Sequence, residues 1–471
     1  MRKIQLVLAI PLITSLLMLT VGPAGAQTEQ SGLDAGFGTG GVARFAIPDH
    51  DLLPLAQATQ RDGKIVVASR DNKNYSPPPT GFSIRVTRFN ANGTLDTTFG
   101  TAGSVRTTVA GPYGPTSTDV TPYAITVDHR NRTVVVGSAD TYLGPEVIAV
   151  VRFTPSGSPD PSFGNNGVVL TSLAGYQDYA TDVVAQGDDR LVVAAASNEL
   201  VNLQPPRAVL LRYNLDGTLD ASFHPPRYVS GAEGFTPMKV AMMPGGRVVT
   251  ASARSYFYLP SQVSLILHRY LPSGAADPTF GTNGKADLVL PSSADTIGDL
   301  TVGVDGSAVV TGKMSHAYED TAYVAKVTPS GVLDPTFGIA GVTEISMPMS
   351  LEGIGAARDR LGRVLVWFRV PPPRFGKVFG VARLTSAGQL DPTFGTGGIA
   401  RPPAELEQTA FVTTGGLQCE AATLTGFPVS PGQNGSVMVT RFRNGPLYQP
   451  ASPFLTICPN VDDVINGSIG S

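Results

Sequence analysis

The chain has 471 residues, of which 42 % are hydrophobic and only 15 % are charged. A chain of this length exceeds one ordinary compact domain unless it folds as a large ring or barrel. Its 53 glycines and 39 prolines, without the Ala/Glu/Lys/Leu bias of helical proteins, predict an all-β protein of short strands. The formal net charge of −3 excludes the basic footprint that phosphate binding needs, so we expect no nucleic-acid partner.

The first 26 residues have the pattern of a secretion signal. Arg2 and Lys3 form a charged start, residues 4–21 are apolar, and Ala24-Gly25-Ala26 is a small-residue cleavage site before Gln27. An uncleaved N-terminal anchor is the alternative. We therefore expect a secreted or periplasmic protein that has no membrane span once the signal is removed.

A motif of the form Leu-Asp-x-x-Phe-Gly recurs, with variation, seven times after this signal. Its aspartates are Asp34, Asp96, Asp160, Asp220, Asp277, Asp334 and Asp391. The steps between them are 57 to 64 residues, and the phenylalanine three positions later never varies. Self-similarity at a fixed period indicates a repeat architecture in which each unit needs its neighbours to bury a core.

Each unit carries four strand signals, three before the motif and one after it. In the first unit they are residues 53–60, 64–69, 82–90 and 103–109. The second strand is a continuous apolar run in most units, which suits a strand buried on both faces. We therefore predict a seven-bladed β-propeller of four-stranded blades over residues 27–445, followed by a C-terminal tail at 446–471.

A basic residue lies eight positions before six of the seven motif aspartates. The pairs are Arg88–Asp96, Arg152–Asp160, Arg212–Asp220, Arg269–Asp277, Lys326–Asp334 and Arg383–Asp391. Arg441 has no aspartate eight positions after it, and Asp34 has no base before it. A closed ring, in which an N-terminal strand at 40–47 completes the last blade, would pair Asp34 with Arg441. We expect all seven pairs to be structural, because a residue that recurs in every unit does not distinguish a ligand site.

The motif copies at 93–100, Gly-Thr-Leu-Asp-Thr-Thr-Phe-Gly, and at 331–338, Gly-Val-Leu-Asp-Pro-Thr-Phe-Gly, resemble the delta-60 repeat family of exported bacterial proteins. The resemblance covers residues 32–445, and the family is similar in appearance to NHL-type propellers. It implies the propeller fold and no established activity.

Two cysteines, Cys419 and Cys458, lie in the part expected to be exported. Disulfides persist in oxidising compartments, so we expect these two to be bonded. Two unpaired buried thiols are the alternative. A zinc site is not expected, because the cysteines are far apart and have no histidine nearby.

The loops between second and third strands vary most from unit to unit, and variable loops on a rigid ring are where binding usually resides. Their tyrosines are Tyr75, Tyr142, Tyr256, Tyr258 and Tyr318. Amphipathic aromatic side chains on loops suit a protein or carbohydrate partner. The alternative is that these tyrosines pack the loops.

An acidic residue lies near the start of the first strand in each unit. These residues are Asp51, Asp119, Asp178, Glu233, Asp295, Glu352 and Glu405. Around a central channel they could hold a Ca²⁺ ion or a cationic ligand, or they are solvated turn residues. No other cofactor is expected.

Enzyme motifs are few, because the five histidines are not at metal-ligand spacing and no Gly-x-Ser-x-Gly sequence occurs. We predict a non-enzymatic module that binds a protein or carbohydrate through its variable-loop face. One alternative is a hydrolase or lyase of an extracellular polymer, with carboxylates from several blades near the channel. Another is a structural spacer of an envelope or secreted assembly. A pocket with convergent carboxylates or a His–acid pair would favour the enzyme, and a broad aromatic patch would favour the binder.

Overall fold

The computed structural model describes residues 33–73, 83–109, 118–141, 144–173, 175–198, 207–223, 238–253, 264–316, 319–359, 361–370, 379–401, 410–418, 421–428 and 436–442. All of them belong to the unit Ser31–Ser471, which is separate from the unit Met1–Gln30. Within these ranges the regular structure is β-strand, apart from one short 3₁₀ helix at Pro244–Gly246. No helix in this part of the chain is long and apolar enough to cross a membrane.

The strands form seven antiparallel sheets, numbered here in chain order. Sheet 1 contains β2 (His50–Thr59), β3 (Ile65–Lys73), β4 (Ser83–Phe89) and β5 (Ser104–Thr107). Sheet 2 contains β6 (Thr118–Val127), β7 (Thr133–Thr141), β8 (Val147–Phe153) and β9 (Val168–Thr171). Sheet 3 contains β10 (Gln177–Ala185), β11 (Leu191–Asn198) and β12 (Arg207–Tyr213). Sheet 4 contains β13 (Lys239–Met243), β14 (Arg247–Ala253), β15 (Ser264–Tyr270) and β16 (Lys285–Val289).

Sheet 5 contains β17 (Ser293–Val302), β18 (Ala308–Ser315), β19 (Thr321–Val327) and β20 (Val342–Ile345). Sheet 6 contains β21 (Glu352–Arg358), β22 (Val364–Arg369), β23 (Phe379–Leu384) and β24 (Ile399–Ala400). Sheet 7 contains β25 (Ala410–Gln418), β26 (Ala421–Pro428), β27 (Val437–Phe442) and the N-terminal strand β1 (Val42–Phe45). The prediction of an all-β fold with four-stranded antiparallel sheets is thus confirmed for six of the seven sheets, and sheet 3 has three described strands.

The second strands of sheets 1 to 6 are buried on both faces. Val134, Val135 and Val136 of β7 are consecutive and have no exposed surface, although successive side chains of a strand point to opposite faces. Seven buried hydrophobic clusters explain this, because each cluster contains residues of two neighbouring sheets. The core is therefore a series of layers between sheets.

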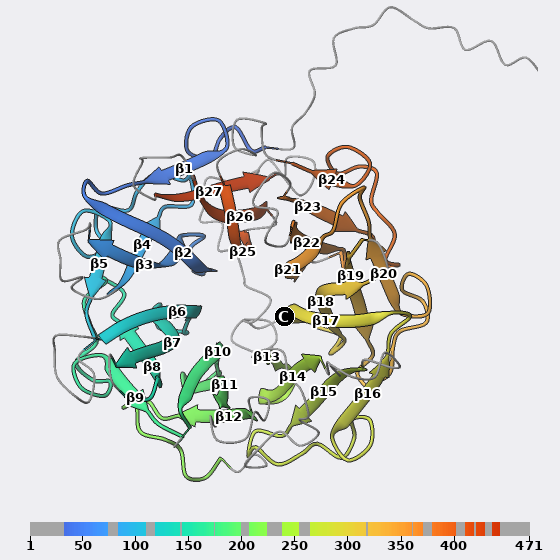
Figure 1. Cartoon of the computed structure of the whole chain (residues 1–471), viewed down its shortest axis with the longest axis horizontal. Coiled ribbons are helices and arrows are strands. Elements are labelled where there is room, and N and C mark those ends of the chain that lie inside the picture. The colour runs from blue at the N-terminus through green and yellow to red at the C-terminus, as the bar shows by residue number, and fades with distance from the viewer. Residues whose placement is uncertain are drawn as a thin grey trace, which may run out of the picture. The chain divides into compact units, whose positions relative to one another are not determined.

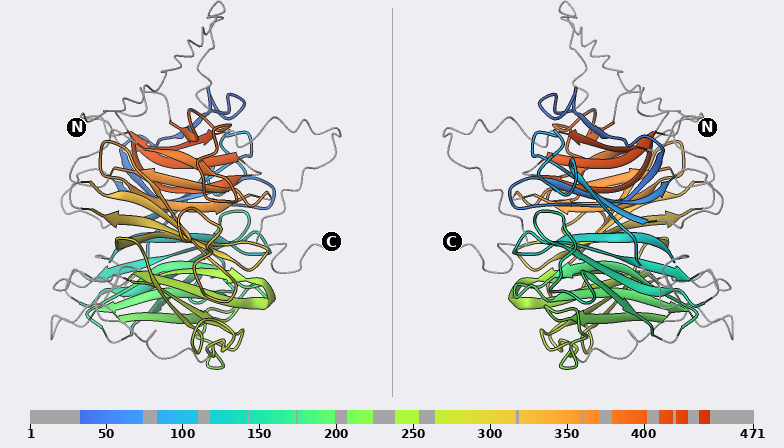
Figure 2. Two further views of the ribbon diagram at one scale, coloured as in Figure 1. Left: turned by 90° about the vertical axis from the view of Figure 1, so that its right-hand side faces the viewer. Right: turned by 90° about the vertical axis from the view of Figure 1, so that its left-hand side faces the viewer.

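The first strands of the sheets surround the centre of the molecule (Figure 1). Each contacts the first strand of the next sheet, and β25 of sheet 7 contacts β2 of sheet 1. In the side views the strands run between the two faces of this arrangement (Figure 2). The buried cluster between sheets 7 and 1 includes Phe37, Val437 and Ile65.

Strand β1 joins the two ends of the described chain. It pairs antiparallel with β27, in a register that places Val42 opposite Thr440 and Phe45 opposite Val437. Just before β1, the backbone N–H of Asp34 donates to the carbonyl of Arg441 at 2.9 Å. Sheet 7 therefore has one strand from near the N-terminus and three from near the C-terminus.

Candidate functional site

The recurring bases and acids of the sequence lie within ion-pair distance of each other. The separations are 2.7 Å for Arg88–Asp96, 2.8 Å for Arg152–Asp160, 2.8 Å for Arg212–Asp220, 2.9 Å for Arg269–Asp277, 2.9 Å for Lys326–Asp334 and 2.9 Å for Arg383–Asp391. Arg441 Nη2 lies 2.7 Å from Asp34 Oδ2. In each of the first six pairs the base stands on the third strand of a sheet and the acid begins the turn that follows.

Each of these bases also packs on the phenylalanine of its motif. The Arg88 guanidinium lies 4.4 Å from the centre of the Phe99 ring, a cation–π distance, and Nη1 of the same group donates to the Pro155 carbonyl of sheet 2 at 2.6 Å. Arg441 lies 4.5 Å from the Phe37 ring and donates to the Ala91 carbonyl of sheet 1. The motif therefore connects one sheet to the next.

A second base approaches the same acids and was missed in the sequence, because it belongs to a different strand of the unit. It lies at or just before the start of the second strand in five sheets. The separations are 3.0 Å for Lys64–Asp96, 3.8 Å for Arg132–Asp160, 2.8 Å for Arg190–Asp220, 2.9 Å for Arg247–Asp277 and 3.9 Å for Arg363–Asp391. The available signal was a basic residue beside the start of the apolar second strand in five copies.

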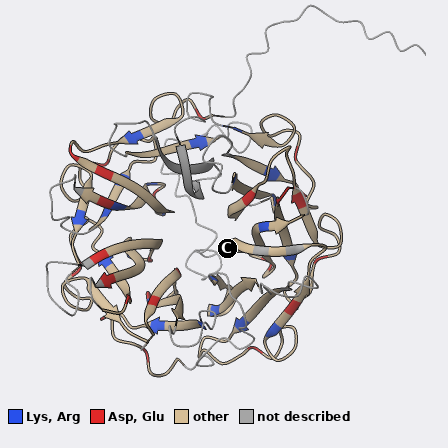
Figure 3. Cartoon of the chain, viewed as in Figure 1, with Lys and Arg blue, Asp and Glu red and all other residues tan. Residues whose placement is uncertain are grey.

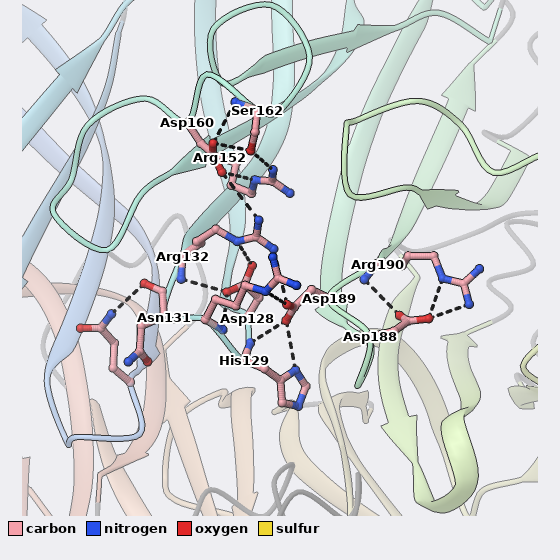
Figure 4. Close-up of polar contacts among 12 residues, drawn as sticks. Asp128, His129, Asn131, Arg132, Arg152, Asp160, Ser162, Asp188, Asp189 and Arg190 are labelled. Carbon is pink, nitrogen blue, oxygen red and sulfur yellow. Dashed lines mark hydrogen bonds and ion pairs between the residues drawn. The ribbon is translucent and has the colours of Figure 1, made fainter.

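The best-connected of these clusters joins sheets 2 and 3 (Figure 4). Arg132 lies 2.6 Å from Asp128, and its guanidinium also reaches Asp160 and, at 3.6 Å, Asp189 of the next sheet. The N–H of His129 donates to Asp189 at 3.0 Å. The carboxylates of Asp128, Asp160 and Asp189 all bind basic or N–H groups of the protein. The cluster therefore links the turns of sheets 2 and 3.

Several residues proposed from the sequence lie outside the described residues. They are Tyr75, Tyr142, Tyr256, Tyr258, Tyr318, Glu233, Glu405, Cys419 and Cys458. Of Asp295 only the backbone is described. The disulfide and the tyrosine-bearing loop surface therefore stay predictions.

The described members of the predicted acidic ring do not converge on one point. Asp178 has no exposed surface, and it accepts bonds from the Leu173 N–H and the Ser197 hydroxyl, both at 2.6 Å. Glu352 instead faces the channel and pairs with Arg369 at 3.1 Å. A shift of one residue along a strand turns a side chain to the other face, so acids at similar but unequal positions point differently. Among the described residues no group of three or more His, Cys, Asp or Glu could hold a metal ion.

A cavity of about 600 Å³ lies among the first strands of sheets 1 to 6. Five of these strands have a β-bulge whose extra residue lines the cavity. These residues are Leu55, Tyr123, Thr181, Gly298 and Ile354. Bulges redirect side chains and are frequent beside functional sites. Charged residues elsewhere are spread over the described sheets (Figure 3), whereas the cavity is lined by residues that differ from sheet to sheet.

Two aspartates break the symmetry of the ring inside this cavity. Asp182 of β10 and Asp299 of β17 each come directly after the bulge residue of their strand. Asp182 pairs with Ala194 and Asp299 with Thr311, which are the fourth residues of the neighbouring second strands. At the equivalent position the other sheets whose side chains are described have small or apolar residues. These are Ala56, Ala124, Val240 and Gly355.

The two carboxyl groups are held by the same contacts. Asp182 accepts the N–H of Val183 at 2.9 Å and that of Val240, in sheet 4, at 3.0 Å. Asp299 accepts the N–H of Leu300 at 2.8 Å and, from sheet 6, the N–H of Ala356 at 2.9 Å. Each carboxyl therefore joins two sheets while also lining the cavity.

Lys239, which also lines the cavity, belongs to the sheet between these aspartates. Burial raises the pKa of Asp299 to about 6, the positive charge of Lys239 opposes this rise, and the negative charge of Asp182 adds to it. Burial also raises the pKa of Asp182, again opposed by Lys239. The cavity thus contains two carboxyls whose pKa values are both raised by burial, with the Lys239 cation near both.

Histidine–acid pairs occur in the described part of the chain, but away from the cavity. They are His50–Asp71 at 2.6 Å, His129–Asp189 at 3.4 Å and His316–Glu344 at 2.8 Å. None of these residues lines the cavity. The chemistry available there is that of carboxyl, amine, guanidinium and phenol groups.

Comparison with known families supports the class of fold. The family described as "Domain of unknown function (DUF5122) beta-propeller" matches residues 60–99, 131–163 and 186–223. Each match runs from the turn after a first strand to the phenylalanine of the motif. The chain therefore has a β-propeller fold, and the match supports a β-propeller repeat family.

Solved structures of low identity resemble this chain. A protein of unknown function from Dyadobacter fermentans is 12 % identical, with 86 % of this chain and 100 % of that chain covered and a TM-score of 0.47. Polysaccharide lyase Uly1 is 11 % identical, with coverage of 89 % and 94 % and a TM-score of 0.47. A catalytically inactive virginiamycin B lyase from Staphylococcus aureus is 10 % identical, with coverage of 85 % and 98 % and a TM-score of 0.44. No curated protein matches the sequence.

Proposed function

We propose that this chain is an exported, seven-bladed β-propeller of the delta-60 repeat type, which binds a carbohydrate in its central channel. The signal-like residues 1–26 support a secreted or periplasmic location. The seven sheets, the contact of β25 with β2 and the Asp34–Arg441 pair support a ring closed by β1.

The observation that carries the binding proposal is the break in symmetry at Asp182 and Asp299. Residues that serve the fold recur in every sheet, whereas these carboxyls occur in two sheets and face a cavity. Burying a carboxyl costs free energy, which small apolar residues at the equivalent positions avoid. A function in the channel explains why this cost is retained.

The lining of the cavity suits a ligand rich in hydroxyl groups. Carboxylates accept hydrogen bonds from hydroxyls, the Lys239 ammonium donates them, and tyrosine rings pack against the C–H faces of sugars. A pocket of apolar and aromatic surface with a few convergent polar groups is typical of small-ligand sites. The proposed ligand position is thus the channel.

Binding of the mature chain, residues 27–471, to a glycan array tests this proposal. We expect specific binding that weakens at least tenfold in Asp182→Asn and in Asp299→Asn. The matched control is Asp287→Asn, because Asp287 is an exposed acid on β16 outside the cavity. Absence of specific glycan binding contradicts the proposal and favours a protein-binding module or a structural spacer. Equal glycan binding by all variants contradicts the channel as the binding site.

A hydrolase or lyase of an extracellular polymer is the second candidate, and the two cavity carboxyls of raised pKa favour it. A carboxyl with a pKa of about 6 beside a second carboxyl can act as a general acid near neutral pH. We expect such an enzyme to release reducing ends from the polysaccharides bound on the array, and Asp299→Asn to abolish the release. If the wild-type chain binds these polysaccharides without cleaving them, it is a binding module.

A further inference from the structure

Two tyrosines of neighbouring sheets meet at the cavity. Tyr123 of β6 and Tyr179 of β10 both line it, and their ring centres are 6.0 Å apart with an angle of 57° between the planes. Tyr123 retains 43 % of its surface exposed, which is high for so large a side chain in a channel. The pair therefore presents aromatic surface to whatever enters the cavity.

A polar group accompanies this aromatic surface. The hydroxyl of Tyr123 and the carboxyl of Glu146 both form hydrogen bonds with the Ser138 side chain. The loop that carries Glu146 is fixed to sheet 3, because its N–H donates to the Tyr176 carbonyl and its carbonyl accepts the Asp178 N–H, both at 3.0 Å. The arrangement is thus built before any ligand arrives.

Like the channel aspartates, these tyrosines break the symmetry of the ring. The other bulge positions that line the cavity hold leucine, threonine, glycine and isoleucine, as given above. The position of Tyr179, opposite the sixth residue of the second strand, is taken in sheets 1, 2, 5 and 6 by Leu53, Thr121, Thr296 and Glu352. Packing of the ring therefore does not require an aromatic residue here.

Tyr179 and Asp182 stand on the same strand and line the same cavity. They are three residues apart, but Thr181 between them is the extra residue of the bulge, so they lie opposite Ala196 and Ala194 of β11, about 7 Å apart along the strand. Aromatic surface and channel carboxyls are therefore separated by more than the width of one sugar ring. A single sugar would contact only one of the two groups.

We infer that Tyr123 and Tyr179 form a platform for one sugar ring of a chain whose neighbouring sugar contacts Asp182, Lys239 and Asp299. The ligand class is therefore an oligosaccharide rather than a monosaccharide. This inference rests on the proposed function, because it assumes that the channel binds carbohydrate. The tyrosine rings contribute stacking and apolar contact, and the contacts of Tyr123 and Glu146 with Ser138 hold the platform in place.

The test uses calorimetry with glucose-, xylose- and mannose-based series, each supplied as monosaccharide, disaccharide and tetrasaccharide. We expect at least one tetrasaccharide to bind ten or more times more tightly than its monosaccharide. Tyr123→Ala and Tyr179→Ala should remove that advantage while changing monosaccharide affinity less than threefold. Tyr123→Phe, which keeps the ring and loses the bond to Ser138, should retain most of it.

The matched control is Tyr176→Ala, since Tyr176 is an exposed tyrosine next to β10 that does not line the cavity. It should bind every sugar like the wild type. Melting temperatures within a few degrees of wild type confirm that each variant is folded. If Asp182→Asn weakens binding while both tyrosine variants bind like wild type, the platform is overturned and the channel site stands. If no series binds the wild-type chain, the proposed function falls, and the platform with it.

Discussion

At the scale of single residues, the channel carboxyls show how one position can serve both the fold and a site. Asp299 binds two backbone N–H groups, one of them from the next sheet, yet burial keeps its pKa near 6. The bonds favour the charged form and the loss of hydration opposes it, and here burial has the larger effect. The folded state therefore binds a proton more tightly than the unfolded chain does.

This difference makes stability depend on pH in a defined direction. Between about pH 4 and pH 6 the folded chain holds a proton on Asp299 that the unfolded chain has lost, so stability falls as pH rises. We expect the unfolding free energy of wild type minus that of Asp299→Asn to fall by roughly 1–3 kcal/mol from pH 4.5 to pH 7.5. Urea denaturation at the two pH values measures it, and the lost hydrogen bond of the variant cancels in the comparison.

Asp305 is the control for this prediction. Burial alone would raise its pKa, but bonds from Arg358 and Ser307 outweigh burial and lower the pKa to about 2. Its titration therefore lies below the tested range, and the difference between wild type and Asp305→Asn should stay constant from pH 4.5 to pH 7.5. A constant difference for Asp299→Asn as well would show that Asp299 ionises normally.

At the scale of the elements, the repeated motif works by reaching the next sheet. Phe99 is fully buried, and its ring contacts Gly157, which lies in the turn after β8 in the next copy of the motif. Gly157 has a φ of +91°, and a Cβ added there would come within 3.0 Å of that ring. Both the conformation and the close approach require glycine, which explains why a glycine accompanies the motif.

Truncation of the motif phenylalanine should therefore weaken two sheets at once. We expect Phe99→Ala to lower the unfolding free energy by about 3–5 kcal/mol, since it leaves a large cavity between sheets 1 and 2. Leu390→Ala, at a motif leucine that is 40 % exposed, should cost less than about 1 kcal/mol. Comparable losses in urea denaturation for the two variants would contradict the role assigned to the phenylalanine.

The elements were predictable from the sequence because each repeats the same signals. The continuous apolar run of the second strand follows from burial on both faces, and the base eight residues before the acid follows from the pairing of the third strand with its turn. The channel site was not predictable in this way. Asp182 and Asp299 belong to no sequence motif. Their difference from the equivalent residues of the other sheets is visible only when the first strands are aligned by their pairing register. That alignment requires the positions of the bulges.

The acidic positions chosen near the strand starts illustrate the same limit. Asp178 and Glu352 stand at the starts of equivalent strands, yet one is buried in its sheet and the other faces the channel. Successive side chains of a strand point to opposite faces of the sheet. A shift of one residue between copies of the repeat therefore places the side chain on the other face. The bulges add a further shift that composition does not reveal.

At the scale of the whole molecule, the account depends on the two ends of the described chain meeting in sheet 7. Asp34 and Arg441 are side chains with 18 % and 15 % of their surface exposed, and they connect the first motif to the last third-strand position. Removing one member of a mostly buried pair leaves the other charge without its partner. This contact should matter more than a surface pair of similar distance.

We expect Asp34→Ala to lower the melting temperature by several degrees, corresponding to about 2–4 kcal/mol. The comparison is Asp287→Ala, which removes an exposed pair with Lys285 at 2.8 Å and should cost less than about 1 kcal/mol. Differential scanning calorimetry measures both. Equal melting temperatures for the two variants would remove the argument that this pair helps to close the ring.

The most direct measurement is a crystal structure of residues 27–471 soaked with the tetrasaccharide that binds best. Our account predicts seven sheets around one channel, with sugar density beside Asp182, Lys239 and Asp299 and a further ring on Tyr123 and Tyr179. Sugar density confined to the outer surface, or an empty channel at a saturating concentration, would contradict it.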